Sequence, residues 1–237
     1  MKNKPEVPPC EQCAHRKNGI SAFSSLKDDE IGDVSASKGC LFFKKGQIVF
    51  HEGNRPNGVY CIHAGKLKLY KLGIEGKEQI IRFVKSGDVI GYRSLLSEEN
   101  LSVSGSALED TSCCFIPKSV LFETIQKNPK FSMDLMKRAC HDLGEATKLI
   151  TNLAQKTVRE RLAEVLLILK SNFGTDEEGI LQISLTREEL ANMTGTATES
   201  VIRLLSEFKD DGYVSLEGRK IKLLDIPGLI RVGNVYD

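Results

Sequence analysis

Two helix-start signals ten residues apart constrain the fold more than any other feature of the chain. Thr186 with Glu189, and Thr196 with Glu199, each match a capping box, in which Thr and Glu cap the first helical turn reciprocally. Gly195 stands between the two boxes and can adopt the positive φ of a tight turn. We therefore expect two short helices around this turn, a helix-turn-helix.

The second of these helices has an apolar and a polar face. Its apolar residues recur at helical spacing and are expected to be buried: Val201, Leu204, Leu205 and Phe208. In a DNA major groove, Arg203 could bind guanine and Glu199 cytosine. Ile202 fits either a thymine methyl group or packing against the segment that follows. The predicted DNA contacts on this helix are Thr196, Thr198, Glu199, Ser200, Ile202 and Arg203.

A hairpin is expected after Gly212, turning at Glu217 and Gly218, which completes a winged helix-turn-helix. Arg219 and Lys220 stand near its tip, where cations meet DNA phosphates. Residues 185–225 nevertheless contain six basic and eight acidic residues, and the net charge of the chain is only +1. Binding must therefore depend on a dimer and specific contacts. The alternative is a helix pair that makes protein contacts without DNA.

Residues 40–117 have a different pattern, with short apolar or alternating runs separated by glycines. This pattern predicts an antiparallel jelly-roll barrel. After it, apolar residues recur at steps of three and four, as in a coiled-coil seam: Met136, Ala139, Leu143, Ala146, Ile150 and Leu153. We expect this helix to pair with a second copy of the chain, although packing on its own domain would give a similar seam.

The expected fold is therefore α+β with a long dimerisation helix between barrel and winged module. The predicted ranges are 1–19 for a flexible cysteine-containing tail, 20–127 for an effector-sensing barrel, 128–154 for the dimerisation helix and 155–237 for the DNA-binding domain. No apolar run is long enough to span a bilayer, and no signal peptide is recognisable, so we expect a cytoplasmic protein without membrane contact. The four histidines form no H-x-H pair, and no G-x-S-x-G or P-loop is present, which argues against an enzyme.

The chain resembles the Crp/Fnr family of transcription regulators. The resemblance rests on GQIVFHEG, GVYCIHAGKLKL and GDVIG in the barrel, TVRERLAEVL after the dimer helix, GTATESVIRLL in the recognition helix and GRKIKL in the wing. It implies a homodimer on a palindromic DNA operator, contact with RNA polymerase, and control by an effector or redox signal at the barrel. It also implies base reading by Glu199 and Arg203.

The resemblance argues against cyclic AMP as the effector. Tyr92 stands where cyclic-AMP binders carry a ribose-binding glutamate, and no arginine near Leu101 or Ser102 could pair with the phosphate. A buried phosphate without its cation is costly. A cyclic-nucleotide-responsive regulator is therefore the less favoured alternative.

Seven cysteines, an odd number, do not suggest a secreted disulfide framework. The resemblance matches Cys10, Cys13 and Cys114 to ligands of a [4Fe–4S] cluster in oxygen sensors, but Gly19 occupies the third N-terminal position. Cys40 is the substitute that we include in the predicted metal set. The open alternatives are a cluster, zinc with His15, a thiol redox switch and no ligand role. Cys61 and Cys140 are interpreted as buried fillers.

Overall fold

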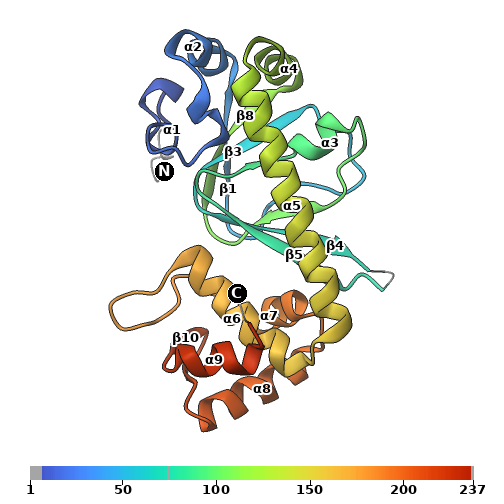
Figure 1. Ribbon diagram of the computed structural model, residues 1–237, viewed down its shortest axis with the longest axis vertical. Helices are drawn as coiled ribbons and strands as arrows, with labels where there is room; N and C mark the ends of the chain where they lie inside the picture. Colours follow the sequence, from blue (N-terminus) through green and yellow to red (C-terminus); the bar gives the residue numbers. More distant parts are fainter. Residues whose placement is uncertain (1–6, 74, 236–237) are drawn as a thin grey trace. The chain divides into compact units, whose positions relative to one another are not determined.

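The computed structural model describes residues 7–73 and 75–235, and the chain forms two compact units (Figure 1). The first unit contains residues 1–71 and 81–144, and the second contains 72–80 and 145–237. These limits differ from the predicted domain ranges, because the boundary falls inside the long helix and one short internal segment joins the second unit. Residues 1–6 of the predicted tail lie outside the described part of the chain.

Two four-stranded sheets form the framework of the first unit. One has the order β1-β8-β3-β6 and the other β2-β7-β4-β5. The registered pairs β1/β8, β3/β8, β3/β6, β2/β7 and β4/β7 are antiparallel. The strands are β1 (Gly39–Phe43), β2 (Ile48–Phe50), β3 (Gly58–Ala64), β4 (Lys66–Leu72), β5 (Glu78–Lys85), β6 (Val89–Ile90), β7 (Ser104–Ala107) and β8 (Thr111–Pro117).

A core lies between these sheets, because strands of both contribute to it. Alternate residues of a strand point to opposite faces, so one face of each sheet supplies the buried side chains. They are Phe50, Ile62, Leu67, Leu69, Val84, Ile90, Leu101, Ala107 and Cys113. The predicted jelly-roll architecture is thus confirmed as two packed antiparallel sheets.

Helices cover the outer face of the β1-β8-β3-β6 sheet and form a second core with it. Val59, Val89 and Ile116 come from the strands, and Phe23, Ile31, Leu121, Phe131 and Leu135 come from helical segments. These segments are η2 (Ala22–Ser25), α2 (Asp28–Ser37), α3 (Tyr92–Leu96), α4 (Lys118–Lys127) and α5 (Pro129–Gln155). Helix α5 begins at Pro129, one residue after the predicted limit, and the Asn128 side chain accepts a hydrogen bond from the Phe131 amide at 2.9 Å.

The described part of the predicted tail is folded onto the first unit. It contains η1 (Cys10–Gln12) and α1 (Ala14–Lys17). The Cys10 amide donates to Ser35 Oγ at 3.0 Å, and Lys38 Nζ donates to the Pro8 carbonyl at 2.5 Å. His15 Nε2 lies 2.7 Å from the His63 carbonyl oxygen. The cysteine pair near the N-terminus is therefore held by α2 and β3.

The second unit contains the predicted winged helix-turn-helix. Its elements are α6 (Val158–Phe173), α7 (Arg187–Thr194), α8 (Thr198–Asp210), β9 (Val214–Glu217), β10 (Lys220–Leu223) and α9 (Ile226–Gly233). The Thr186–Glu189 capping box is present, with Thr186 Oγ1 accepting from the Glu189 amide at 3.0 Å. The predicted Thr196–Glu199 box is wrong. The N-cap of α8 is Ala197, which has no side-chain acceptor, because the turn ends one residue later than the pattern suggests.

Candidate functional site

The recognition-helix candidate, α8, separates buried apolar side chains from exposed ones as predicted. Its four apolar-face residues, Val201, Leu204, Leu205 and Phe208, are at most 4% exposed. Glu199 and Arg203 are exposed, and Ile202 is 51% exposed, so about half of its surface is open to solvent. Thr196, Thr198 and Ser200 are partly buried. The helix thus presents a continuous exposed surface beside a fully packed one.

The turn between α7 and α8 is held by a glycine with positive φ and by two side chains that donate hydrogen bonds to its carbonyl groups. Gly195 has φ +71°, and a Cβ there would lie 2.8 Å from a methyl group of Leu153, so a side chain would be both strained and crowded. Arg161 donates through Nε to the Thr194 carbonyl at 2.8 Å. Lys77, also in the second unit, donates to the Thr196 carbonyl at 2.8 Å. Arg161 thus satisfies a carbonyl group that the end of α7 leaves free, and Lys77 satisfies one in the turn that follows.

Arg203 is oriented by an ion pair within α8, but its side chain remains accessible to solvent. Its side chain is 69% exposed and donates to Glu207 at 2.7 Å, one turn further along α8. Glu207 also pairs with Arg159 at 2.9 Å, and Arg159 reaches Asp211 as well. If Arg203 turned to another partner, Glu207 would keep the Arg159 guanidinium. An exposed pair of this kind is worth about 0.3–0.5 kcal/mol, so releasing Arg203 costs little.

The hairpin of β9 and β10 is tied to the start of α7. Arg187 donates to the Gly218 carbonyl at the hairpin tip, at 2.9 Å, and burial lowers the pKa of this guanidinium. Gly218 itself has φ +56°, as the turn requires. Arg219 and Lys220 are exposed beside it, and Lys220 is 3.7 Å from Glu217. The wing therefore carries two accessible cations on an anchored turn.

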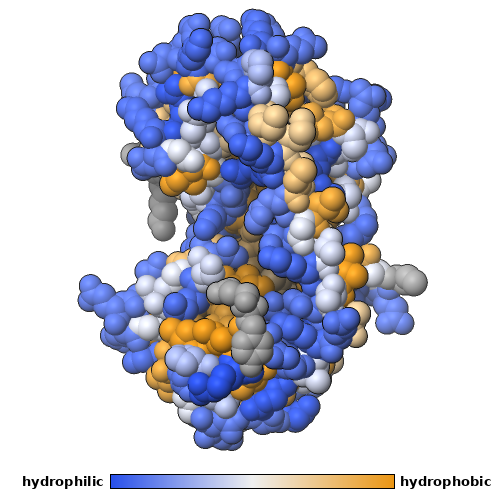
Figure 2. Space-filling model, in the orientation of Figure 1, coloured by the Kyte–Doolittle hydropathy of each residue, from blue (hydrophilic) through white to orange (hydrophobic). Residues whose placement is uncertain are grey.

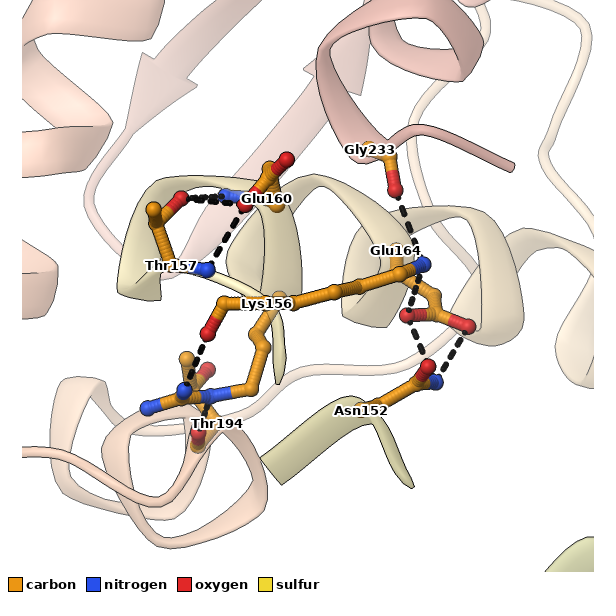
Figure 3. Close-up of polar contacts among 8 residues, drawn as sticks. Asn152, Lys156, Thr157, Glu160, Glu164, Thr194 and Gly233 are labelled. Atoms are coloured by element: carbon orange, nitrogen blue, oxygen red, sulfur yellow. Dashed lines mark hydrogen bonds and ion pairs between the residues drawn. The ribbon is translucent and has the colours of Figure 1, made fainter. Parts of the chain in front are cut away.

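A polar network joins the end of α5 to α6 within the second unit (Figure 3). Lys156 Nζ donates to Glu164 at 2.8 Å and to the Gly233 carbonyl at 2.9 Å. Asn152 donates to both oxygens of the same carboxylate, at 2.8 and 2.9 Å. Thr157 with Glu160 caps the start of α6. The network fixes the direction in which the chain leaves α5.

The predicted dimer seam forms an apolar stripe along α5. Met136, Leu143 and Ile150 are 57%, 67% and 68% exposed, and Leu153 is 37% exposed. Ala139 and Ala146 are partly buried between them. Figure 2 shows apolar side chains following the course of α5. The opposite face is occupied, since Phe131 and Leu135 pack into the first unit.

The first unit has a small cavity near Tyr92. It has a volume of about 60 Å³ and is lined by Phe50, Leu69, Arg82, Ile90, Gly91, Tyr92, Arg93, Ser94, Leu101, Ser102, Val103 and Asp142. Tyr92 donates to Asp142 at 2.8 Å, and Arg82 donates to the other oxygen of that carboxylate at 3.0 Å. Burial, followed by the bond to Asp142, raises the pKa of the Tyr92 hydroxyl. Two arginines, Arg82 and Arg93, thus line the cavity with Leu101 and Ser102, and Arg82 is paired within the protein.

The cysteines of the predicted metal set lie in one region, with Cys61 as an addition. Strand register places Cys114 of β8 opposite both Cys40 of β1 and Cys61 of β3. Cys10 packs against the same outer core as Cys61. Burial raises the pKa of the Cys114 thiol to about 11 and also raises that of Cys10, while the Lys38 ammonium opposes both shifts. Cys61, interpreted as filler, packs partly buried against the outer core, and its position beside Cys114 comes from strand register, which is not a local signal.

The described cysteines and histidines do not form a preformed metal site. Within residues 7–73 and 75–235, no three His, Cys, Asp or Glu side chains converge as a metal ion would need. His15 contacts the His63 backbone instead of a cysteine. Cys140, the other presumed filler, is exposed on α5.

The described helices include none that could cross a membrane.

Comparison with known proteins agrees with this architecture. Residues 40–128 match the family described as "Cyclic nucleotide-binding domain", and residues 160–232 match the "Crp-like helix-turn-helix domain". The chain is 31% identical over 218 residues to the transcriptional activator protein anr of Pseudomonas aeruginosa, covering 91% of this chain and 88% of that protein. It is 29% identical to the fumarate and nitrate reduction regulatory protein of Vibrio cholerae, covering 95% and 90%.

Solved structures show the same fold. FixK2 from Bradyrhizobium japonicum has a TM-score of 0.74 at 24% identity, covering 84% of this chain and 99% of that one. A CRP/FNR-family regulator from Thermus thermophilus has a TM-score of 0.71 at 25% identity, covering 84% and 100%. With sheet pair, long helix and winged module in one chain, the protein belongs to the Crp/Fnr family of transcription regulators.

Proposed function

We propose that the protein acts as a homodimer on a palindromic DNA operator, with one α8 in the major groove of each half-site. The exposed surface of α8 carries this proposal, because Glu199, Ile202 and Arg203 project from a helix whose other face is fully packed. Arg203 would bind guanine with its two-pronged guanidinium, and Glu199 would accept from cytosine. Two copies would have to place these helices about 34 Å apart, one turn of DNA.

Other contacts of the interface follow from this placement. Arg219 and Lys220 at the wing tip would contact DNA phosphates. Thr196, Thr198 and Ser200, at the start of α8, would lie near the DNA sugar-phosphate backbone. The apolar stripe of α5 would form the dimer contact. We also propose contact with RNA polymerase and a cytoplasmic location, which a regulator of chromosomal DNA requires.

The first unit would receive the signal. Cyclic AMP is disfavoured by the cavity, since about 60 Å³ is far below the roughly 300 Å³ of a typical small-molecule site. Of the two arginines that line the cavity, Arg82 is engaged by Asp142, so a phosphate that paired with Arg82 would have to displace that carboxylate. The proximity of several thiols supports a redox signal instead.

Arg203→Ala tests the groove assignment. A lost guanine contact costs about 1–3 kcal/mol, and two half-sites double the loss, so affinity for the selected operator should fall about 30-fold to 20,000-fold. Fluorescence anisotropy on a palindrome selected from a randomised library measures this loss. The preference at one base step should relax at the same time. Arg203→Lys keeps the charge but not the fork, so it should retain binding to unrelated DNA while losing discrimination.

Arg231→Ala is the matched control, because Arg231 has the same 69% side-chain exposure but lies on α9. Its operator affinity should stay near that of the parent protein. Equal losses on every sequence would contradict the base-reading role of Arg203. If no duplex is selected at all, the protein regulates through protein contacts.

A further inference from the structure

Three cysteines form a row across the β1-β8-β3-β6 sheet of the first unit. Cys114 lies directly opposite Cys40 on one side and Cys61 on the other. Facing residues of antiparallel strands have Cα atoms about 4.5 or 5.5 Å apart, depending on the pair type. A disulfide accepts Cα separations of about 4.4–6.8 Å. Both pairs therefore satisfy the Cα spacing that a disulfide requires.

The three side chains share one face of the sheet, because residues directly opposite in register point the same way. The adjacent Cys113 points to the other face and belongs to the core between the sheets. Cys40, Cys114 and Cys61 differ in access to solvent. Cys40 is exposed on the edge strand β1, Cys114 is buried, and Cys61 is partly buried under the helix-covered core beside Cys10.

We propose that Cys40 and Cys114 form a reversible disulfide when the protein meets a peroxide. Exposure decides between the two pairs, since a dissolved oxidant reaches Cys40 directly and Cys61 less readily. Cys40 and Cys114 would be the redox-sensitive residues of the signal suggested under the proposed function. Formation of the disulfide does not itself depend on DNA binding.

The reaction balances with hydrogen peroxide as the oxidant. The Cys40 sulfur, having lost its proton to solvent, attacks one peroxide oxygen, the O–O bond breaks, and the departing hydroxide takes up a proton to become water. Cys40 is then a sulfenic acid. The Cys114 sulfur attacks the Cys40 sulfur, the S–O bond breaks, and a second water leaves with the Cys114 proton. Two thiols are oxidised and one peroxide is reduced to two waters; a dithiol reverses the step by exchange.

Thiol counting with peptide mapping tests the proposal on the reduced full-length protein. Titration in denaturant should give seven thiols before peroxide treatment and two fewer afterwards. Non-reducing digestion should join the peptide of Cys40 to that of Cys113 and Cys114, and Cys113→Ser should retain this link. Cys40→Ser should abolish it. Because Cys114 is buried, Cys40→Ser carries the test, and Cys114→Ala supports it if that variant folds.

Cys140→Ser is the matched control, since Cys140 is also exposed but lies on α5. It should retain the Cys40–Cys114 bond, as should Cys61→Ser. A bond between Cys61 and Cys114, a bond confined to Cys10 and Cys13, or an unchanged thiol count would each overturn the proposal. Operator binding measured in parallel is a separate readout, so disulfide formation and DNA recognition can fail independently.

Discussion

Replacing Lys156 by Met should destabilise the second unit through the network at the end of α5. The Lys156 and Glu164 side chains are only 16% and 19% exposed, and their atoms lie 2.8 Å apart. Removing one partner of a buried pair costs about 3–5 kcal/mol, because the other charge stays buried without compensation. Here the two side chains are partly exposed, so solvent reduces the cost of leaving the Glu164 charge unpaired. Asn152 also keeps two hydrogen bonds to Glu164. We expect a loss of about 2–3 kcal/mol.

Thermal unfolding of the full-length protein measures the effect. For a protein of this size, 1 kcal/mol shifts Tm by about 2–4 °C, so Lys156→Met should lower the Tm of the full-length protein by about 4–12 °C. Met preserves the length and apolar stem of the side chain, which confines the change to the ammonium group. The double variant with Glu164→Gln should cost less than the sum of the single changes, by about 0.5–3 kcal/mol.

Lys148→Met provides the control, since Lys148 pairs with Glu145 on the same helix but the two side chains are 73% and 54% exposed. This substitution should leave Tm close to that of the parent protein, and 0.5 M salt should not increase its effect. The reasoning is refuted if Lys156→Met shifts Tm no more than Lys148→Met. It is also refuted if the effects of the two substitutions at the network simply add.

Two further outcomes follow from the stripe and the thiols. Leu143→Asp should raise the dimer dissociation constant at least about 100-fold in sedimentation equilibrium, because both copies lose about 1.5–3 kcal/mol of apolar burial. Leu72→Asp, at an exposed leucine outside α5, should leave the dissociation constant unchanged. The buried Cys114 thiol has its pKa raised to about 11, so the folded state keeps a proton that the unfolded chain releases near pH 8.5. Stability is therefore complete below about pH 8.5 and falls as pH rises toward 11, by at most about 3 kcal/mol. Cys114→Ala should flatten that decline in urea titrations, whereas a decline equally flattened by Cys140→Ala would contradict this origin.

Features encoded by neighbouring residues could be predicted from the sequence. The Thr186–Glu189 box, the positive φ of Gly195 and the hairpin turn at Gly218 each depend on a few consecutive side chains. The start of α5 at Pro129 is of the same kind. The predicted box at Thr196 failed although its motif is equally good, because a turn can end at Ala197 once tertiary contacts hold the Thr196 carbonyl. A local motif thus shows that a helix starts, but its first residue depends on packing.

Features that join distant segments could not be predicted. Lys156 meets Glu164 and Gly233 only after α6 and α9 have packed. Cys40, Cys61 and Cys114 become neighbours through register, and a shift of one residue on β8 would move Cys114 to the other face and Cys113 into the row. The adjacent pair Cys113 and Cys114 is ambiguous in the sequence for this reason. Only pairing of the strands decides which thiol is outside.

Ile202 shows how structure narrows a choice that the sequence leaves open. Packing on the wing and contact with a thymine methyl group both suit an isoleucine at that position. In the structure it is 51% exposed, while Val201 beside it is fully buried, so the second unit leaves about half of the Ile202 surface uncovered. It lies between the exposed Glu199 and Arg203 on the first turns of α8. A stiff β-branched side chain there adds apolar contact area to a polar reading surface, which fits a base edge better than water.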